Sequence, residues 1–178
     1  MDLKQHFELL AQYNQWMNGS LYFSAQSLSD DALKEDRKAF FGSILGTLNH
    51  IMVGDIVWLR RFSAHLPDLS SLKPLKHWPQ PKALTDILFD SISTLQEARR
   101  QLDDIVIEFV GQLHIEHFDT VLHYQNMKGQ TQGKAFSMVL QHFFNHQTHH
   151  RGQVTTLLSQ SAIDVGVTDL LVLIPDAD

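Results

Sequence analysis

Residues 142–154 read HFFNHQTHHRGQV and place four histidines within nine positions of a predicted helix. At about 100° per residue, side chains four positions apart lie one turn above each other, so His142, His146 and His150 project within roughly 80° of arc. Apolar residues flank the same face: Val139, Phe143 and Leu157. Polar groups that face a core need hydrogen bonds or a metal ion to offset the loss of water. The stretch therefore predicts a core-facing helix that carries part of a metal site.

The spacing leaves open which histidine pairs with His146. His149 lies about 60° from His146 around the helix, whereas His150 lies about 40° away. This difference favours His150 over His149 only modestly. Gln153 continues the same face one turn beyond His150, next to any site formed there.

A third ligand is expected from another segment, because two histidines leave a first-row metal ion short of protein ligands. His50 is the best candidate, since it lies in a second predicted helix with Gly46 and Gly54 one turn to either side. The glycines leave space beside the ring, which suits a bound ion and a substrate. The alternative is that they allow close helix packing and that His50 makes one buried hydrogen bond.

Apolar residues recur with helical spacing in four long segments: residues 3–26, 43–64, 84–113 and 134–160. Ser43 is a typical N-cap for the second segment. In the third, an apolar residue recurs every seven positions from Leu88 to Phe109, as in helix bundles. The segments predict an all-α fold, a four-helix bundle formed by a single domain over residues 1–178.

The connecting segments differ in composition. Between the third and fourth helices, residues 118–124 alternate before Lys128 and Gly129, which predicts a small β-hairpin insertion. Residues 29–41 are charged and residues 66–81 hold four of the five prolines, so both are expected to be loops. The apolar residues 170–174 suggest a docked end or a partner surface.

Composition excludes several classes of function. The 178 residues include no cysteine, which rules out disulfides, thiolate metal ligands and a cysteine nucleophile. The net charge of -6 argues against nucleic-acid binding through phosphate neutralisation. No segment approaches the roughly 20 apolar residues of a membrane span, and the first residues do not resemble a signal peptide. We expect a cytoplasmic protein with a small-molecule substrate.

Two further residues are candidates for supporting the site. Asn14 lies on the apolar face of the first predicted helix, where its amide needs a partner. A site in the core can supply that partner, and so can another helix. Arg151, like Gln153, either recognises an acidic substrate or stabilises the helix and a neighbouring loop.

The chain resembles the DinB/YfiT-like family of small four-helix-bundle proteins over nearly its whole length. Four stretches carry the resemblance: LAQYNQWMN at 10–18, SILGTLNHIMVGDIVWLRRF at 43–62, LHYQNMKGQ at 122–130 and HFFNHQTHHRGQV at 142–154. In that family, one histidine of the second helix and an HxxxH pair before Arg-Gly-Gln bind a divalent metal. The resemblance places these ligands at His50, His146 and His150. It leaves His142 and His149 as packing or pocket residues beside the site.

The resemblance also implies a range of functions. Some relatives are thiol-dependent S-transferases or isomerases that use a low-molecular-weight thiol, and this is the leading hypothesis. Three histidine ligands leave a coordination position open, as catalysis requires. The alternatives are a non-catalytic metal-binding module of a stress response and a metal-dependent hydrolase. We expect zinc or nickel, with iron, cobalt or manganese as alternatives, and a homodimer.

Overall fold

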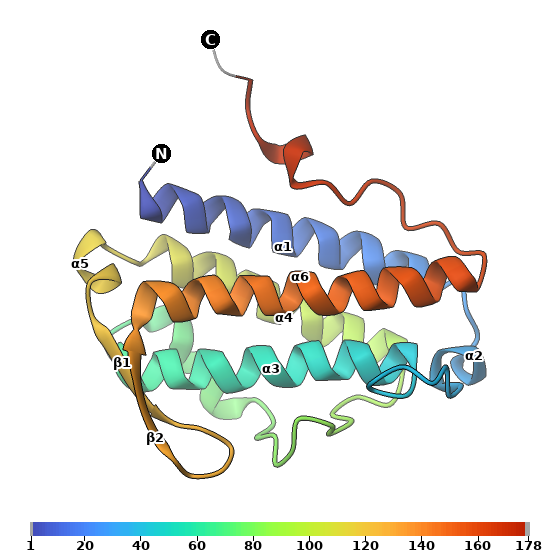
Figure 1. Ribbon diagram of the computed structural model, residues 1–178, viewed down its shortest axis with the longest axis horizontal. Helices are drawn as coiled ribbons and strands as arrows, with labels where there is room; N and C mark the ends of the chain where they lie inside the picture. The colour runs from blue at the N-terminus through green and yellow to red at the C-terminus, as the bar shows by residue number, and fades with distance from the viewer. Residues whose placement is uncertain (1, 177–178) are drawn as a thin grey trace.

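The computed structural model describes residues 2–176 and consists mainly of helices (Figure 1). The four long helices are α1 (Leu3–Ala25), α3 (Ile44–His65), α4 (Ile92–Gly111) and α6 (Phe136–Gln160). α1 packs against α4 and α6, and α3 packs against α6. This packing confirms the predicted helix bundle. Within residues 2–176, no helix is both long enough and apolar enough to cross a membrane.

Short polar side chains cap the first turns of α1, α3 and α4. An Asp2 carboxylate oxygen accepts a hydrogen bond from the Gln5 amide at 2.8 Å, and Ser43 Oγ accepts one from the Gly46 amide at 2.9 Å. Such caps satisfy backbone N–H groups that have no partner within the helix. The predicted N-cap at Ser43 is confirmed, and α3 begins at the next residue.

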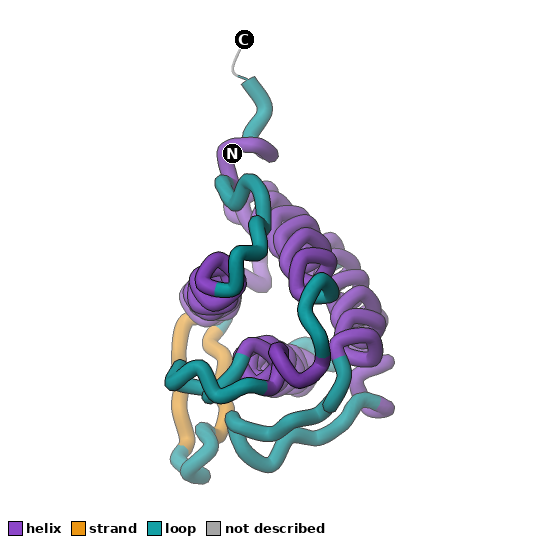
Figure 2. Tube along the Cα trace, turned by 90° about the vertical axis from the view of Figure 1, so that its right-hand side faces the viewer, coloured by secondary structure: helices purple, strands orange, loops and turns teal. Residues whose placement is uncertain are grey.

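The predicted β-hairpin is also confirmed. Strands β1 (Val121–Gln125) and β2 (Thr131–Ala135) pair antiparallel and lie between the short helix α5 (Ile115–Phe118) and α6. Gly129 takes a positive φ of 74° at the turn, a conformation that glycine adopts without strain. Figure 2 shows the two strands beside the helices, so the hairpin is an addition to the bundle.

Short helices occupy the remaining segments. α2 (Asp30–Lys34) and the 3-10 helix η1 (Ser70–His77) lie in segments that we expected to be loops, so those expectations were wrong in part. Ser29 caps α2, and Leu72 and Leu75 of η1 are buried against the bundle. A second 3-10 helix, η2 (Leu170–Leu173), lies near the C-terminal end.

The third long helix is shorter than predicted. α4 begins at Ile92, whereas apolar spacing predicted a helix from residue 84. Residues 84–91 are irregular because Asn49 of α3 binds their backbone, accepting hydrogen bonds from the amides of Leu88 and Phe89 at 2.9 and 3.0 Å. Leu88 still packs against the core. Its burial explains why the seven-residue spacing continues beyond the start of the helix.

One end of the core is built from phenylalanine rings. Phe62 of α3 stacks on Phe109 of α4, with ring centroids 5.5 Å apart, and meets Phe136 and Phe143 of α6 edge-on. All four side chains are buried. Fully burying one such side chain contributes about 1.5–3 kcal/mol. The rings therefore join three helices and fix how α3 faces α6.

The C-terminal segment leaves α6 and passes along the outside of α1 (Figure 1). The Tyr13 hydroxyl of α1 donates a hydrogen bond to the Thr168 carbonyl at 2.6 Å. Beyond this contact, Leu171 and Val172 of η2 are 73% and 59% exposed. The segment is therefore docked by this backbone hydrogen bond and by Ile163 and Val165, which pack against the core, while η2 presents apolar side chains to solvent.

Candidate metal centre

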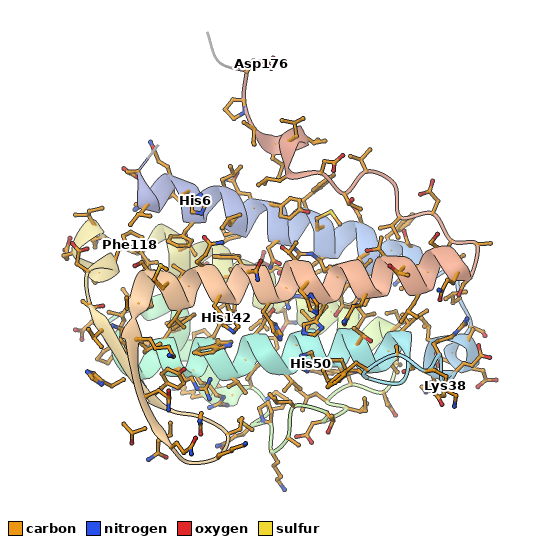
Figure 3. All side chains as sticks on the ribbon, viewed as in Figure 1. His6, Lys38, His50, Phe118, His142 and Asp176 are labelled. Atoms are coloured by element: carbon orange, nitrogen blue, oxygen red, sulfur yellow. The ribbon has the colours of Figure 1, made fainter. Side chains whose placement is uncertain are left out.

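Three histidine rings meet where α3 faces α6, and we call them the three-histidine cluster: His50, His146 and His150. His50 Nε2 lies 3.1 Å from His146 Nε2 and 3.2 Å from His150 Nε2. His50 comes from α3, and the other two lie one turn apart on α6. In Figure 3, His50 lies at the boundary between these two helices. The structure therefore brings together the three residues that the resemblance singled out.

Hydrogen bonds at Nδ1 orient two of the rings. His50 Nδ1 lies 2.8 Å from the Leu84 carbonyl oxygen, and His150 Nδ1 lies 2.8 Å from Gln153 Oε1. Both oxygens can only accept, so Nδ1 carries the proton and Nε2 carries a free lone pair. Such bonds hold metal-binding histidines in the tautomer that coordinates an ion.

The electrostatics of the cluster favour a cation between the rings. Burial lowers the pKa of His50 and His150, and it lowers the pKa of His146 to about 3, because loss of water disfavours the charged imidazolium. At neutral pH all three rings are therefore neutral. The Nε2 lone pairs of His50 and His150 then face each other without a proton between them. A divalent ion resolves this repulsion, so the cluster can hold a metal ion.

Gly54 makes room for His146. A Cβ atom at position 54 would lie 2.8 Å from His146 Cε1, closer than side chains approach one another. We expected the space beside Gly46 and Gly54 to suit an ion and a substrate, and this was wrong. The His146 ring fills the space at Gly54, and the Phe41 carbonyl oxygen fills the space at Gly46.

Phe41 covers one side of the cluster. Its ring stacks on His50 with centroids 3.7 Å apart and an interplanar angle of 16°, and it meets the His150 ring edge-on at 5.5 Å. The turn that carries it closes through a 2.7 Å hydrogen bond from the Arg37 amide to the Gly42 carbonyl. Phe41 was not predicted as a site residue because it lies in an irregular segment, where apolar spacing carries no information.

Known proteins similar to this chain identify its family. The model of the DinB family matches residues 1–174 of the chain. The chain belongs to the DinB family. Protein DinB of Bacillus subtilis (strain 168) is 27% identical over 162 residues, which cover 90% of this chain and 88% of that relative. No solved structure is similar enough to count as a match. The resemblance noted in the sequence is thus confirmed.

Two histidines of α6 lie outside the three-histidine cluster of this DinB-family chain. The His142 ring is 6.0 Å from the His146 ring and meets Trp58 edge-on at 5.5 Å. His149 is exposed, and its Nε2 makes only a 3.4 Å contact with Gln153 Nε2. Neither belongs to the group whose ligand atoms lie within 4.8 Å of one another.

Arg151 and Asn14 face the bundle interior and not the cluster. Arg151 is 3% exposed and donates hydrogen bonds to Asn14 Oδ1 and Thr148 Oγ1. Asn14 also donates to Asp103 Oδ1 at 3.2 Å. Both residues therefore make contacts between helices and do not contact the cluster. Gln153, in contrast, contacts the cluster directly through His150.

A buried ionic network that the sequence did not predict lies next to the cluster. Arg99 of α4 pairs with Asp55 of α3 at 2.5 Å and with Asp103 at 3.0 Å. Gln147 of α6 donates to the other Asp55 oxygen at 2.7 Å. Asp55 follows Gly54, and Gln147 follows His146. The Asp55–Gln147 bond therefore joins α3 to α6 one residue away from the place where His146 meets Gly54.

Proposed function

We propose that His50, His146 and His150 bind one divalent transition metal ion and that the chain is a metal-dependent enzyme acting on a small molecule. The convergence of three neutral Nε2 atoms, two of them on rings held through Nδ1, carries this proposal. Imidazole suits several first-row ions, and thiolate ligands are excluded because the chain has no cysteine. We propose zinc or nickel, with iron, cobalt or manganese as alternatives.

The number of protein ligands favours an open site. Among residues 2–176, no further histidine, aspartate or glutamate joins the group of three. Structural zinc sites have four protein ligands, whereas catalytic sites have three and leave a position for water or substrate. His146 is only half-buried, so solvent reaches the cluster from one side. These features support a catalytic role over a purely structural one.

The residues also favour one kind of substrate group. A bound ion would act as a Lewis acid, polarising a carbonyl or lowering the pKa of a bound thiol or water. Three neutral imidazoles do not compensate the charge of such an ion, so they favour an anionic group such as a thiolate. The thiol must come from a second molecule, since the chain has none. The uncompensated charge and the absence of cysteine support a thiol-dependent S-transferase or isomerase that uses a low-molecular-weight thiol.

Hydrolysis has less support from the residues around the cluster. A hydrolase needs a general base that can reach a water molecule. Asp55 is the acidic residue next to Gly54, but it is 1% exposed and already bonded to Arg99 and Gln147. Its carboxylate is therefore committed to the interior of the bundle.

Elemental analysis tests the proposed metal site. Tag-free protein, purified without added metal or chelator, should contain about one transition-metal ion per chain. A content below about a tenth of that, persisting after reconstitution with zinc, nickel, iron and manganese, would overturn the metal site.

Cobalt-substituted protein tests the open position. Adding mercaptoethanol should produce a thiolate-to-cobalt absorption band, because a thiolate can enter the coordination position that the histidines leave free. An unchanged spectrum at saturating thiol would contradict thiol chemistry at this site. It would favour a non-catalytic metal-binding module.

A further inference from the structure

A pocket of about 390 Å³ lies beside the three-histidine cluster, between α3, the hairpin and α6. Six residues line it: Trp58, Tyr124, Lys134, Met138, Val139 and His142. Neither the metal site nor the core of the bundle accounts for this pocket. Its size is within the range of pockets that hold small organic molecules.

His142 connects the pocket to the cluster. It lines the pocket, its ring contacts Trp58, and its ring centroid lies 6.0 Å from that of His146. Met138, His142, His146 and His150 follow one another at four-residue intervals along one face of α6. In Figure 3, His142 and His50 lie along the same boundary between α6 and α3. The pocket therefore adjoins the cluster through His142.

The walls of the pocket are aromatic and apolar. Trp58 and Tyr124 meet edge-on with ring centroids 5.2 Å apart, and Met138 is 71% exposed beside them. An exposed methionine next to two aromatic rings offers an adaptable apolar surface. These walls suit the apolar part of a ligand.

The charged groups at the pocket are positive. Lys134 lines the pocket. The guanidinium carbon of Arg61 lies 4.5 Å from the ring centroid of Trp58 and 4.7 Å from that of Tyr124. Within residues 2–176, no acidic residue lines the pocket, although the full sequence has 20 acidic and 14 basic residues. In the part of the chain that the structure describes, Lys134 makes no ion pair. A pocket of this charge favours anions.

We propose that this pocket binds the apolar body of an amphipathic organic anion, whose charged end pairs with Lys134 and whose other end reaches the three-histidine cluster. The inference rests on the proposed function, because it names the class of substrate that the metal centre would act on. Met138 and His146 are eight residues apart on α6, which corresponds to about 12 Å. A ligand that spans the site therefore has an apolar body of roughly this length.

Two probes of opposite charge test the pocket itself. Phenylpropanesulfonate and phenylpropyltrimethylammonium share one apolar body, and a sulfonate is a poor metal ligand. Their dissociation constants would be measured by calorimetry on metal-free and zinc-loaded protein, with zinc content determined separately. We expect the sulfonate to bind about tenfold more tightly than the ammonium compound in both forms. Equal binding, or tighter binding of the cation, would overturn the proposal.

Two charge-reversal variants assign the effect to the pocket. Lys134→Glu should abolish the preference for the sulfonate, whereas Lys128→Glu makes the same charge change at the exposed hairpin turn and should preserve it. An equal effect of both variants would show a general charge effect and would overturn the assignment. Zinc content should be unchanged in both. A wild-type protein that binds no zinc would instead contradict the proposed function, independently of the affinity measured for the sulfonate.

A bridging probe tests the connection to the cluster. Mercaptohexanesulfonate carries a thiol and a sulfonate at opposite ends of an apolar chain, and mercaptoethanesulfonate is too short to reach both sites. Titrations of cobalt-loaded protein, followed by the thiolate-to-cobalt band, should show about tenfold tighter binding of the longer compound. Lys134→Glu should remove this difference. Equal affinities in the wild-type protein would show that pocket and metal centre do not bind one molecule.

Discussion

Each ring of the three-histidine cluster depends on a particular neighbour for its position. The Leu84 carbonyl fixes His50, Gln153 fixes His150, and Gly54 allows His146 to approach α3. Partners that orient metal-binding residues typically contribute 10–100-fold in metal affinity. The affinity of the site therefore depends on residues that would not touch the ion.

Alanine substitutions test which histidines bind the ion. His146→Ala or His150→Ala should abolish stoichiometric zinc binding, and His50→Ala should weaken it strongly, because each removes one of three ligands. His149→Ala is the matched control and should retain most of the bound zinc, since its ring lies outside the cluster. Zinc content after gel filtration measures the result. An equal loss in all four variants would contradict the ligand assignment.

Gly54→Ala tests the close approach of His146 to α3. The added methyl group would meet His146 Cε1 at 2.8 Å, so the ring must move and zinc affinity should fall by roughly tenfold or more. Gly152→Ala is the control on α6, because among residues 2–176 a Cβ at position 152 would meet no atom within 4 Å beyond its chain neighbours and the nearby backbone of its own helix. That variant should keep zinc affinity and raise stability by up to about 1 kcal/mol. Unchanged zinc affinity in Gly54→Ala would show that the ring adapts.

The pKa of His146 predicts a pH dependence for the metal-free protein. Burial lowers this pKa from 6.5 to about 3, so between these values the unfolded chain binds more protons than the folded one. The stabilising contribution is complete above about pH 6.5 and is lost as pH falls toward 3. His146→Gln should therefore lose less stability than the wild-type protein between about pH 7 and pH 5, as measured by urea unfolding.

The difference in pH dependence between the wild-type protein and His146→Gln isolates the contribution of His146 from that of other titrating groups. Burial raises the pKa of Asp103 to about 6, which opposes the effect of His146 in part of this range. Asp103 is present in both proteins, so its contribution cancels in the difference. Equal pH dependence in the two proteins would mean that the folded state does not protect His146 from protonation.

At the scale of elements, α3 and α6 are joined at two places. The first is the three-histidine cluster, and the second is the hydrogen bond between Asp55 and Gln147 on the core side of the cluster. Arg99 extends this second contact to α4. The network therefore fixes the spacing between the helices that the cluster requires.

Asp55→Asn tests the contribution of this network to stability. Removing one partner of a buried pair leaves the Arg99 charge insufficiently compensated, so we expect a loss of about 3 kcal/mol in the free energy of unfolding. Glu8→Gln disrupts the exposed Lys4–Glu8 pair and should cost less than about 0.5 kcal/mol. Urea unfolding of both variants measures the contrast. A similar small loss in both would show that the buried pair adds little to stability.

Local patterns predicted the helices, the Ser43 cap and the hairpin well, because each depends on residues that are close in the sequence. The predicted start of α4 was wrong because a distant side chain, Asn49, binds the backbone of residues 84–91. The ionic network was missed for the same reason. Asp55 and Arg99 are 44 positions apart, and no periodicity shows that they meet. At the site, helical spacing placed His142, His146 and His150 on one face and favoured His150 over His149 only modestly, so the choice of ligands came from the family resemblance. Neither gave any information about Phe41.

At the scale of the whole molecule, a metal ion that binds only the folded chain stabilises it by mass action. If the free metal-ion concentration is about a hundredfold above the dissociation constant, removal of the ion should lower the melting temperature by roughly 5–10 °C. Differential scanning calorimetry before and after dialysis against a chelator measures this shift. The His146→Ala protein should show no shift, and a shift of equal size there would indicate an effect of the chelator unrelated to the site.

Self-association stays a prediction. The exposed side chains of η2, Leu171 and Val172, are the apolar surface that we expected to contribute to a homodimer. Light scattering of the wild-type protein and of a Leu171→Asp variant would measure its contribution. A dimer that persists in the variant would place the interface elsewhere on the molecule.

The hydrogen bond from His50 to the Leu84 carbonyl has a consequence for the rate of metal exchange. Asn49 and His50 are neighbours on α3, and both bind residues 84–91. A ring held at both nitrogens cannot turn away from an ion unless its bond to that segment breaks. Release of the ion would then be limited by opening of the segment, so dissociation should be slow and should accelerate in dilute urea, well before the bundle unfolds.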